Sequence, residues 1–260
     1  MSRLRVATWN LNSFLARQSR LESWLAEVCP DVICLQETKL ADEALPKDDF
    51  ARLGYDVAHS GPGRWNGVAI ASRIGLDEVI RGFVFDPESA AEGRLISARC
   101  GPIKVASVYV PNGRSLDSDQ YLYKLRFLED LRRHLEEWAK PTDELVLCGD
   151  FNVAPDDRDV WDPGAFEGAT HVSPPERKAL ADLEDWGLID VMRALYPDPF
   201  IYTWWDYRAG SFHKHQGMRI DLVLATRPLA ERLVWAVIDR NARKGERPSD
   251  HAPVLADFAA

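Results

Sequence analysis

The chain has 260 residues, of which 46% are hydrophobic, and a formal net charge of −9. This length can bury a large core, so we expect one domain over residues 1–260 rather than two small ones. No stretch has the roughly 20 uncharged apolar residues of a membrane helix, and we expect a soluble, cytoplasmic protein. The negative charge argues against unassisted binding to nucleic acid, whose phosphates are normally neutralised by Lys and Arg.

Short apolar runs rich in Val, Ile and Leu recur along the chain. Their lengths and the turn residues beside them favour β-strands. The expected strands are residues 4–9, 32–36, 67–72, 95–99, 105–110, 145–148, 220–225 and 253–258.

Three segments have helical spacing. In the clearest, apolar residues keep a three-four spacing from Tyr121 to Trp138, with Asp117 or Ser118 as the N-cap and Pro141 as the stop. A shorter helix covers residues 21–28, and a third covers 176–186. The Pro-rich stretch 155–175 is predicted to be a long surface loop, and such loops often line functional sites.

These elements predict a layered α/β fold. Strands outnumber helices, and many are joined by loops too short for a crossover helix, so the sheets should be mixed. The simplest architecture packs two sheets together with helices outside. The four cysteines have no Cys-x-x-Cys spacing, and Cys34 and Cys148 lie in apolar runs. Disulfides and a zinc site are therefore not expected.

Polar residues follow several of the apolar runs directly. The segments are Trp9-Asn10-Leu11-Asn12, Leu35-Gln36-Glu37-Thr38 and Cys148-Gly149-Asp150-Phe151-Asn152. If these strand ends converge, they form an oxygen-rich cluster of the kind that binds a hard divalent cation such as Mg²⁺. The alternative is that each residue only caps a strand or turn. Glu37 favours the cluster, because a carboxylate directly after a buried strand needs a cation or a donor nearby.

Two later segments add an acidic residue and a histidine. Asp221 lies inside the apolar run Ile220-Asp221-Leu222-Val223-Leu224, and Asp250 directly precedes His251. Asp221 can accept a hydrogen bond from the His251 ring and orient it, or it can form a salt bridge with Arg219 or another Arg. Spacing alone does not separate these alternatives. With no Gly-x-Ser-x-Gly motif and no cysteine in a polar context, metal-assisted hydrolysis by one or two ions is favoured.

At this point the sequence resembles the exonuclease III family of abasic-site endonucleases, within the endonuclease, exonuclease and phosphatase superfamily. The segments that carry the resemblance span nearly the whole chain. They are ATWNLNSFLAR, PDVICLQETKL, RWNGVAIASR, VYVPNG, LVLCGDFNVAP, YTWWDYR, GMRIDLVLA and PSDHAPVLADF. The resemblance implies a four-layer α/β sandwich of two mixed sheets flanked by helices, with the site in a cleft at one end.

The resemblance also implies roles for residues of this chain. Metal binding falls to Glu37, assisted by Asn10, Asn12, Asp150, Asn152, Asp250 and His251, with Mg²⁺ as the cofactor and Mn²⁺ as a possible substitute. Asp150 would activate the attacking water, Asn152 would hold the phosphate or metal, and Tyr109 would stabilise the transition state or leaving oxygen. His251, oriented by Asp221, would contact a non-bridging phosphate oxygen.

The expected substrate is duplex DNA with abasic sites or blocked 3′ ends, and no obligate protein partner is evident. The reaction would be cleavage on the 5′ side of an abasic sugar, with 3′-5′ exonuclease and 3′-phosphatase activity. Trp204, Met218 and Ile220 fall where the family lines the sugar pocket, although Trp204 alone also fits a core aromatic. The DNA phosphate backbone would be bound by Arg64, Asn112, Arg114, Arg208 and Lys214. Local positive charge would then outweigh the negative net charge of the chain.

Two alternatives stay open at the level of sequence. One is a relative in the same superfamily that acts on RNA or on a small phosphorylated substrate. The other is a silent scaffold that keeps the fold. The WWDYR and MRIDLVLA segments favour DNA repair, and the intact cluster of Glu37, Asp150 and His251 argues against a scaffold.

Overall fold

The computed structural model describes residues 3–198 and 200–259 and contains two six-stranded β-sheets. The first sheet has the strand order β11 (Leu233–Ile238), β12 (Val254–Ala259), β1 (Arg3–Asn10), β2 (Val32–Gln36), β4 (Val68–Ser72) and β3 (Asp56–Ser60). The second has the order β5 (Asp77–Arg81), β6 (Leu95–Cys100), β7 (Ile103–Tyr109), β8 (Leu145–Asp150), β10 (Asp221–Thr226) and β9 (Leu188–Asp190). Both sheets are mixed, as expected.

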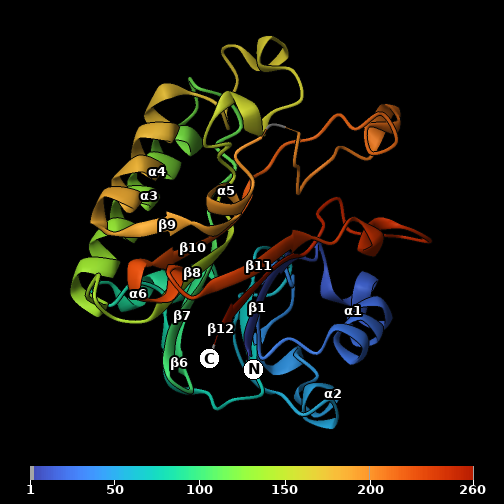
Figure 1. Cartoon of the computed structure of the whole chain (residues 1–260), viewed down its shortest axis with the longest axis vertical. Helices are drawn as coiled ribbons and strands as arrows, with labels where there is room; N and C mark the ends of the chain where they lie inside the picture. The colour runs from blue at the N-terminus through green and yellow to red at the C-terminus, as the bar shows by residue number, and fades with distance from the viewer. Residues whose placement is uncertain (1–2, 199, 260) are drawn as a thin grey trace.

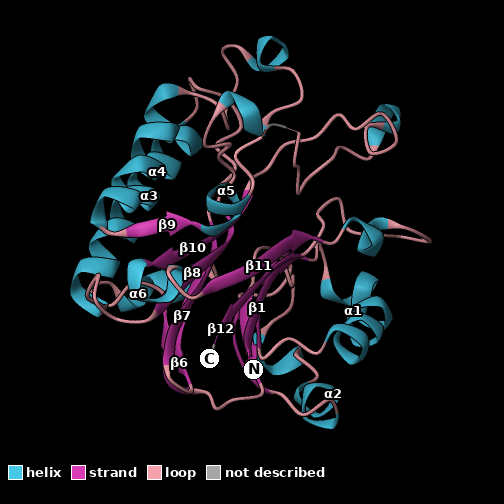
Figure 2. Ribbon diagram, viewed as in Figure 1, coloured by secondary structure: helices cyan, strands magenta, loops and turns pink. Residues whose placement is uncertain are grey.

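The two sheets pack face to face, and the longer helices lie outside them (Figures 1 and 2). One hydrophobic cluster joins residues of both sheets, including Val6, Cys34, Val105 and Cys148. A second packs α3 (Asp119–Trp138) and α4 (Pro174–Trp186) on the second sheet, and a third packs α1 (Phe14–Val28) and α2 (Lys47–Arg52) on the first. This gives the four-layer sandwich that the resemblance implied. The remaining α-helices are short: α5 (Val191–Leu195) and α6 (Arg227–Ala230).

Parallel pairing brings key strand ends together. β1 runs parallel to β2, with Asn10 opposite Gln36, and β7 runs parallel to β8, with Tyr109 opposite Asp150. β10 is antiparallel to β8, so that its first residue, Asp221, pairs with Asp150. One edge of the sandwich therefore collects the carboxyl ends of four strands and the start of a fifth.

The predicted helix ends agree with the structure, but α1 begins at Phe14 rather than at residue 21. Ser118 caps α3 by accepting a hydrogen bond from the backbone of Tyr121, and a capping box of Ser173 and Glu176 starts α4 slightly before the predicted position. On the inner face of α3, Lys124 and Phe127 are buried, whereas Leu125 is only half-buried.

The sequence reading missed β3, β5, β9 and β11. All four are edge strands. β3 and β5 include exposed polar or charged positions and β9 has only three residues, whereas β11 is an apolar run of six residues with Val234 and Trp235 exposed. The 155–175 segment is mainly loop with short 3₁₀ turns, and it extends beyond the sheets (Figure 1). The four cysteines are free thiols. Within the described residues, no helix combines the length and apolar character required to cross a membrane.

Candidate active site

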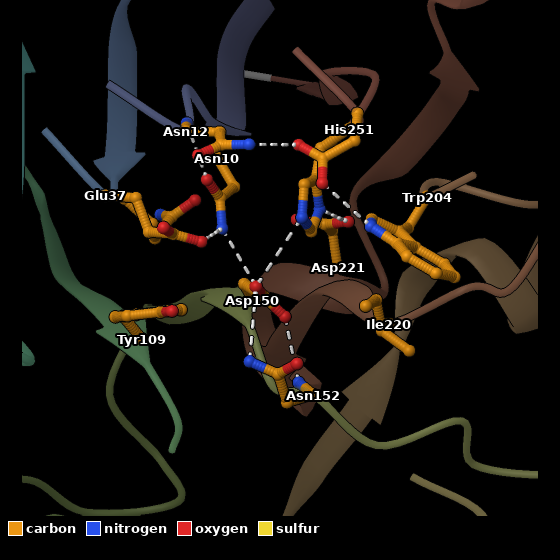
Figure 3. A network of polar contacts seen from close by, with 12 residues as sticks. Asn10, Asn12, Glu37, Tyr109, Asp150, Asn152, Trp204, Ile220, Asp221 and His251 are labelled. Atoms are coloured by element: carbon orange, nitrogen blue, oxygen red, sulfur yellow. Dashed lines mark hydrogen bonds and ion pairs between the residues drawn. The ribbon is translucent and has the colours of Figure 1, made fainter. Parts of the chain in front are cut away.

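Glu37, Asp150 and His251 meet at the strand-end edge of the sandwich (Figure 3). Ligand atoms from the three side chains all lie within 4.8 Å of one another. Glu37 follows β2, Asp150 ends β8, and His251 lies in the loop before β12. Asp150 and His251 are buried, at 1% and 4% exposure. Two carboxylates at this spacing fit a hard divalent cation, which normally takes one or two carboxylates together with water and substrate oxygens.

Asn10 orients the two carboxylates. Its amide nitrogen donates to Glu37 Oε1 and to Asp150 Oδ2, both at 2.9 Å. Its oxygen accepts from the backbone nitrogen of Asn12 at 2.9 Å, so it faces away from the carboxylates. Lys39 lies 3.0 Å from Glu37 Oε2 and compensates part of the negative charge.

Asp250 and Asn12 lie beside this cluster and bind each other. Asn12 Nδ2 donates to Asp250 Oδ1 at 3.0 Å, and the Trp204 indole donates to Asp250 Oδ2 at 3.1 Å. Lys39 Nζ donates to Asn12 Oδ1 at 2.6 Å. In this arrangement the Asp250 carboxylate links the cluster to Trp204, while the predicted metal-binding roles of Asp250 and Asn12 stay predictions.

His251 is held in the orientation that the sequence suggested as one of two alternatives. Its Nδ1 lies 2.8 Å from Asp221 Oδ2, and its Nε2 lies 3.8 Å from Asp150 Oδ2. Arg219 instead pairs with Asp159 and Asp190, so the alternative salt bridge to Asp221 is wrong. Burial would lower the pKa of His251, but the charges of Asp221 and Asp150 raise it to about 10. The ring is therefore an imidazolium at neutral pH, with an N–H available to the cleft.

The pKa of Asp150 is shifted into the neutral range. Burial raises it to about 7, against the opposing effect of His251 and with a contribution from Asp221. Burial also raises the pKa of Tyr109 well above its usual value, so its hydroxyl remains a donor. Asp150 is thus matched to proton transfer near pH 7, and Tyr109 to donating a hydrogen bond to a developing oxyanion.

Asn152 adopts a left-handed backbone conformation with φ of 50° and is tied to Asp150. Its backbone nitrogen donates to Asp150 Oδ1 at 2.9 Å, and its side-chain nitrogen donates to the carbonyl of Val110 at 2.9 Å. Its Oδ1 accepts from Asn112 Nδ2 at 3.3 Å. Glu37 is also left-handed, with φ of 49°. Such strain at non-glycine residues persists where the surroundings enforce it.

The cluster opens into a cleft of about 420 Å³ with an apolar wall. Trp204, Met218, Ile220 and Phe166 form that wall. Met218 and Ile220 are 3% exposed, and Trp204 is half-buried. Asn112 and Arg114 also line the cleft.

The other residues that were predicted to contact the DNA backbone lie outside the cleft. Arg64 is exposed over the Trp65 ring, and Lys214 is exposed. Arg208 pairs with neighbouring Asp206 at 2.9 Å. Their assignment to DNA binding stays a prediction.

Sequence reasoning missed His171, which comes from the 155–175 loop and lines the cleft. Its Nε2 lies 3.1 Å from both Asn112 Nδ2 and Asn152 Oδ1. Burial, followed by the charge of Lys124, lowers the pKa of His171 to about 4, so the ring is neutral. The only available signal was its position in a loop already expected to line a site.

The model of the endonuclease/exonuclease/phosphatase family matches residues 7–251 of the chain. The chain belongs to this family. It is 35% identical to exodeoxyribonuclease III of Haemophilus influenzae, with 98% of this chain and all of that protein covered.

Two solved structures place the chain in the same branch. An AP endonuclease from Archaeoglobus fulgidus has a TM-score of 0.95 at 40% identity, and the match covers 99% of this chain and all of that one. The 3′ phosphatase NExo from Neisseria, solved with a product DNA hairpin, has a TM-score of 0.95 at 36% identity, with the same shares covered. This member of the exonuclease III family therefore shares its whole fold with enzymes named for abasic-site and 3′-end chemistry.

Proposed function

We propose that the chain is a Mg²⁺-dependent DNA-repair phosphodiesterase that acts on duplex DNA with abasic sites or blocked 3′ ends. The observation that carries the proposal is the meeting of Glu37, Asp150 and His251 beside an apolar pocket. A pocket walled by Trp204, Met218 and Ile220 suits a sugar without its base better than a full nucleotide. Mn²⁺ is expected to substitute for Mg²⁺, and a cytoplasmic location stays a prediction.

The residues divide the work of hydrolysis. Glu37 and Asp150 would hold the cation, which supplies charge for the phosphoryl oxygens when bound. Asp150, ionised when the cation is bound, would accept a proton from the attacking water. The imidazolium of His251 donates to a non-bridging phosphate oxygen, and the Tyr109 hydroxyl donates to the leaving oxygen. Asn152, fixed against Asp150, supports the phosphate.

The expected products follow from this geometry and from the names of the relatives. Water attack on the phosphodiester 5′ to an abasic sugar leaves a 3′-hydroxyl. The same attack at a 3′ end removes a nucleotide or a terminal phosphate. We infer that all three activities share this one cleft.

The test is an incubation with a duplex that carries a single abasic analogue, with Mg²⁺ and with EDTA. Blunt, nicked and 3′-phosphate duplexes and a matched RNA duplex run alongside. We expect metal-dependent incision and end processing of DNA, and Asp150→Ala should lower turnover at least about a hundredfold. Absence of both DNA activities, or a preference for RNA, would contradict the proposal.

A further inference from the structure

Lys124 is a fully buried cation in the middle of α3, with 0% exposure. Its position on the helix belongs to the inward face, alongside Tyr121, Phe127, Leu128 and Leu131. Burial of an ammonium destabilises the folded protein unless hydrogen bonds and an opposite charge compensate it. A lysine at this position therefore needs partners.

The partners come from three different segments around the cleft. Lys124 Nζ donates to the carbonyl of Asn152 at 2.6 Å, to the carbonyl of Asn112 at 3.2 Å and to the carboxylate of Glu176. An ammonium has three N–H donors, so all of them are used. The segments joined are the loop after β8, the loop after β7 and the first turn of α4.

Glu176 extends the restraint to the loop that carries His171. One carboxylate oxygen accepts from the Thr170 hydroxyl at 2.7 Å and from the His171 backbone nitrogen at 3.0 Å. The other accepts from the backbone and hydroxyl of Ser173 at 3.0 and 2.6 Å. Burial alone would raise the pKa of Glu176, but Lys124 and these hydroxyls hold it below the usual value. The carboxylate is therefore charged and saturated with donors.

The held segments carry side chains that meet in the cleft. Asn152, Asn112 and His171 contact one another there, and Asn152 is tied to Asp150. The Asn112 loop packs closely against Thr170 and Lys124, because a Cβ added to Gly113 would lie 2.8 Å from Thr170 Oγ1 and 3.1 Å from Lys124 Cδ. The carbonyl that Lys124 binds belongs to Asn152 itself, whose left-handed backbone needs an external anchor.

We propose that Lys124 is a positioning residue for phosphoester hydrolysis, which anchors the Asn152 and Asn112 loops and, through Glu176, the His171 loop. The proposal rests on the proposed function. Lys124 has no exposed surface, so it acts through Asn152 rather than on the substrate. Loss of the anchor should lower kcat, because Asn152 moves relative to the phosphate. Metal affinity should change less, because neither Glu37 nor Asp150, which would hold the cation, is hydrogen-bonded to Lys124.

The first variant removes both charges together, because Lys124→Met alone would leave Glu176 buried and unpaired. In Lys124→Met/Glu176→Gln we expect kcat to fall at least about tenfold, with the Mn²⁺ affinity measured by EPR changed less than kcat. The ¹⁵N shift of the Asn152 side-chain amide should also change. A folded double variant with wild-type kcat and an unchanged Asn152 signal would overturn the proposal.

The matched control is a lysine-carboxylate pair at the opposite ends of the same strands. Lys104 lies near the start of β7 and pairs with Asp143, just before β8, at 2.9 Å. Lys104→Met/Asp143→Asn should leave kcat and the Asn152 signal unchanged. An equal loss of kcat in this control would show a general stability effect and overturn the proposal.

A single variant keeps the proposal testable if the double variant does not fold. Glu176→Gln leaves the ammonium on both carbonyls but weakens its hold on the His171 loop, so KM should rise more than kcat falls. The reverse pattern would overturn the proposal. If the wild type hydrolyses no DNA, the proposed function fails instead, while the NMR response of Asn152 to these variants still tests the anchor.

Discussion

His251 Nδ1 lies 2.8 Å from the carboxylate of Asp221, a residue with no exposed surface. The Asp221 charge is the main factor that offsets burial and keeps the pKa of His251 near 10. Asp221→Asn removes that charge while preserving shape, so we expect kcat to fall at least about a hundredfold.

The pH dependence of the same variant gives a sharper check. The raised pKa of His251 means that the imidazolium is lost only as pH rises through about 10. In Asp221→Asn the alkaline limb of the kcat profile should move to lower pH. An unmoved limb would show that Asp221 does not set the charge of His251.

Metal binding should release a proton near neutral pH. Asp150 has a pKa of about 7 without metal, so it is partly protonated at neutral pH, whereas a cation needs the ionised carboxylate. Titration calorimetry of Mg²⁺ or Mn²⁺ at pH 7, in two buffers with different ionisation heats, measures the release. It should vanish at pH 9, where Asp150 is already ionised, and in Asp150→Asn. Release that persists in this variant would assign the proton to another group.

His171 should restrict the cleft against an extruded sugar. It lines the pocket, and its backbone is left-handed with φ of 80°, a conformation that glycine adopts without strain. His171→Gly should raise the ratio of abasic-site incision to 3′-end trimming by about tenfold, the size of effect that a few pocket atoms produce. The control His171→Asn keeps a polar side chain in a left-handed position. An unchanged ratio in His171→Gly would remove His171 from the determinants of specificity.

The cluster could be predicted from the sequence because local pattern and strand pairing agree. Asn10, Glu37 and Asp150 each end or directly follow a strand of buried residues, and parallel pairing places those ends at one edge. The competing roles of Asp221 could not be separated in the same way. Asp159 and Asp190, which are distant in the sequence, form salt bridges with Arg219 and so leave Asp221 to bind His251.

Lys124 and His171 illustrate what the sequence could not predict. A lysine in an amphipathic helix is normally expected on the solvent-exposed face. The burial of Lys124 depends on backbone carbonyls of two distant loops, which accept its hydrogen bonds. His171 lies in a segment without hydrophobic periodicity, so the neighbouring sequence does not predict the direction of its ring. Both positions are set by tertiary contacts rather than by propensity.

Local basic residues should decide DNA affinity despite the net charge of −9. Arg64, Arg114 and Lys214 are exposed outside the named strands and helices, and Arg114 lines the cleft. Neutralising all three should weaken duplex binding and reduce the slope of log K against log salt by about one for each lost phosphate contact. Arg73 follows β4, Arg99 lies near the end of β6 and Lys140 precedes β8, all at the strand ends opposite the site, and these three form the control set. Equal effects of the two sets would contradict a local DNA-binding surface.

His134, in α3, should make the fold sensitive to acid. Its Nδ1 accepts a hydrogen bond from the backbone nitrogen of Val84 at 3.2 Å, and Nε2 lies 3.0 Å from Ser97 Oγ, so the ring is neutral. Burial lowers the pKa of His134 to about 4. Its unfolded value is near 6.5, so stability is complete above that pH and falls as pH drops from 6.5 towards 4. The loss of unfolding free energy at pH 5 should be about 2 kcal/mol.

Urea unfolding at pH 7 and pH 5 measures this loss. His134→Gln should reduce the difference between the two pH values, whereas His213→Gln at an exposed position should not. An equal acid sensitivity in His134→Gln would assign the effect to other groups.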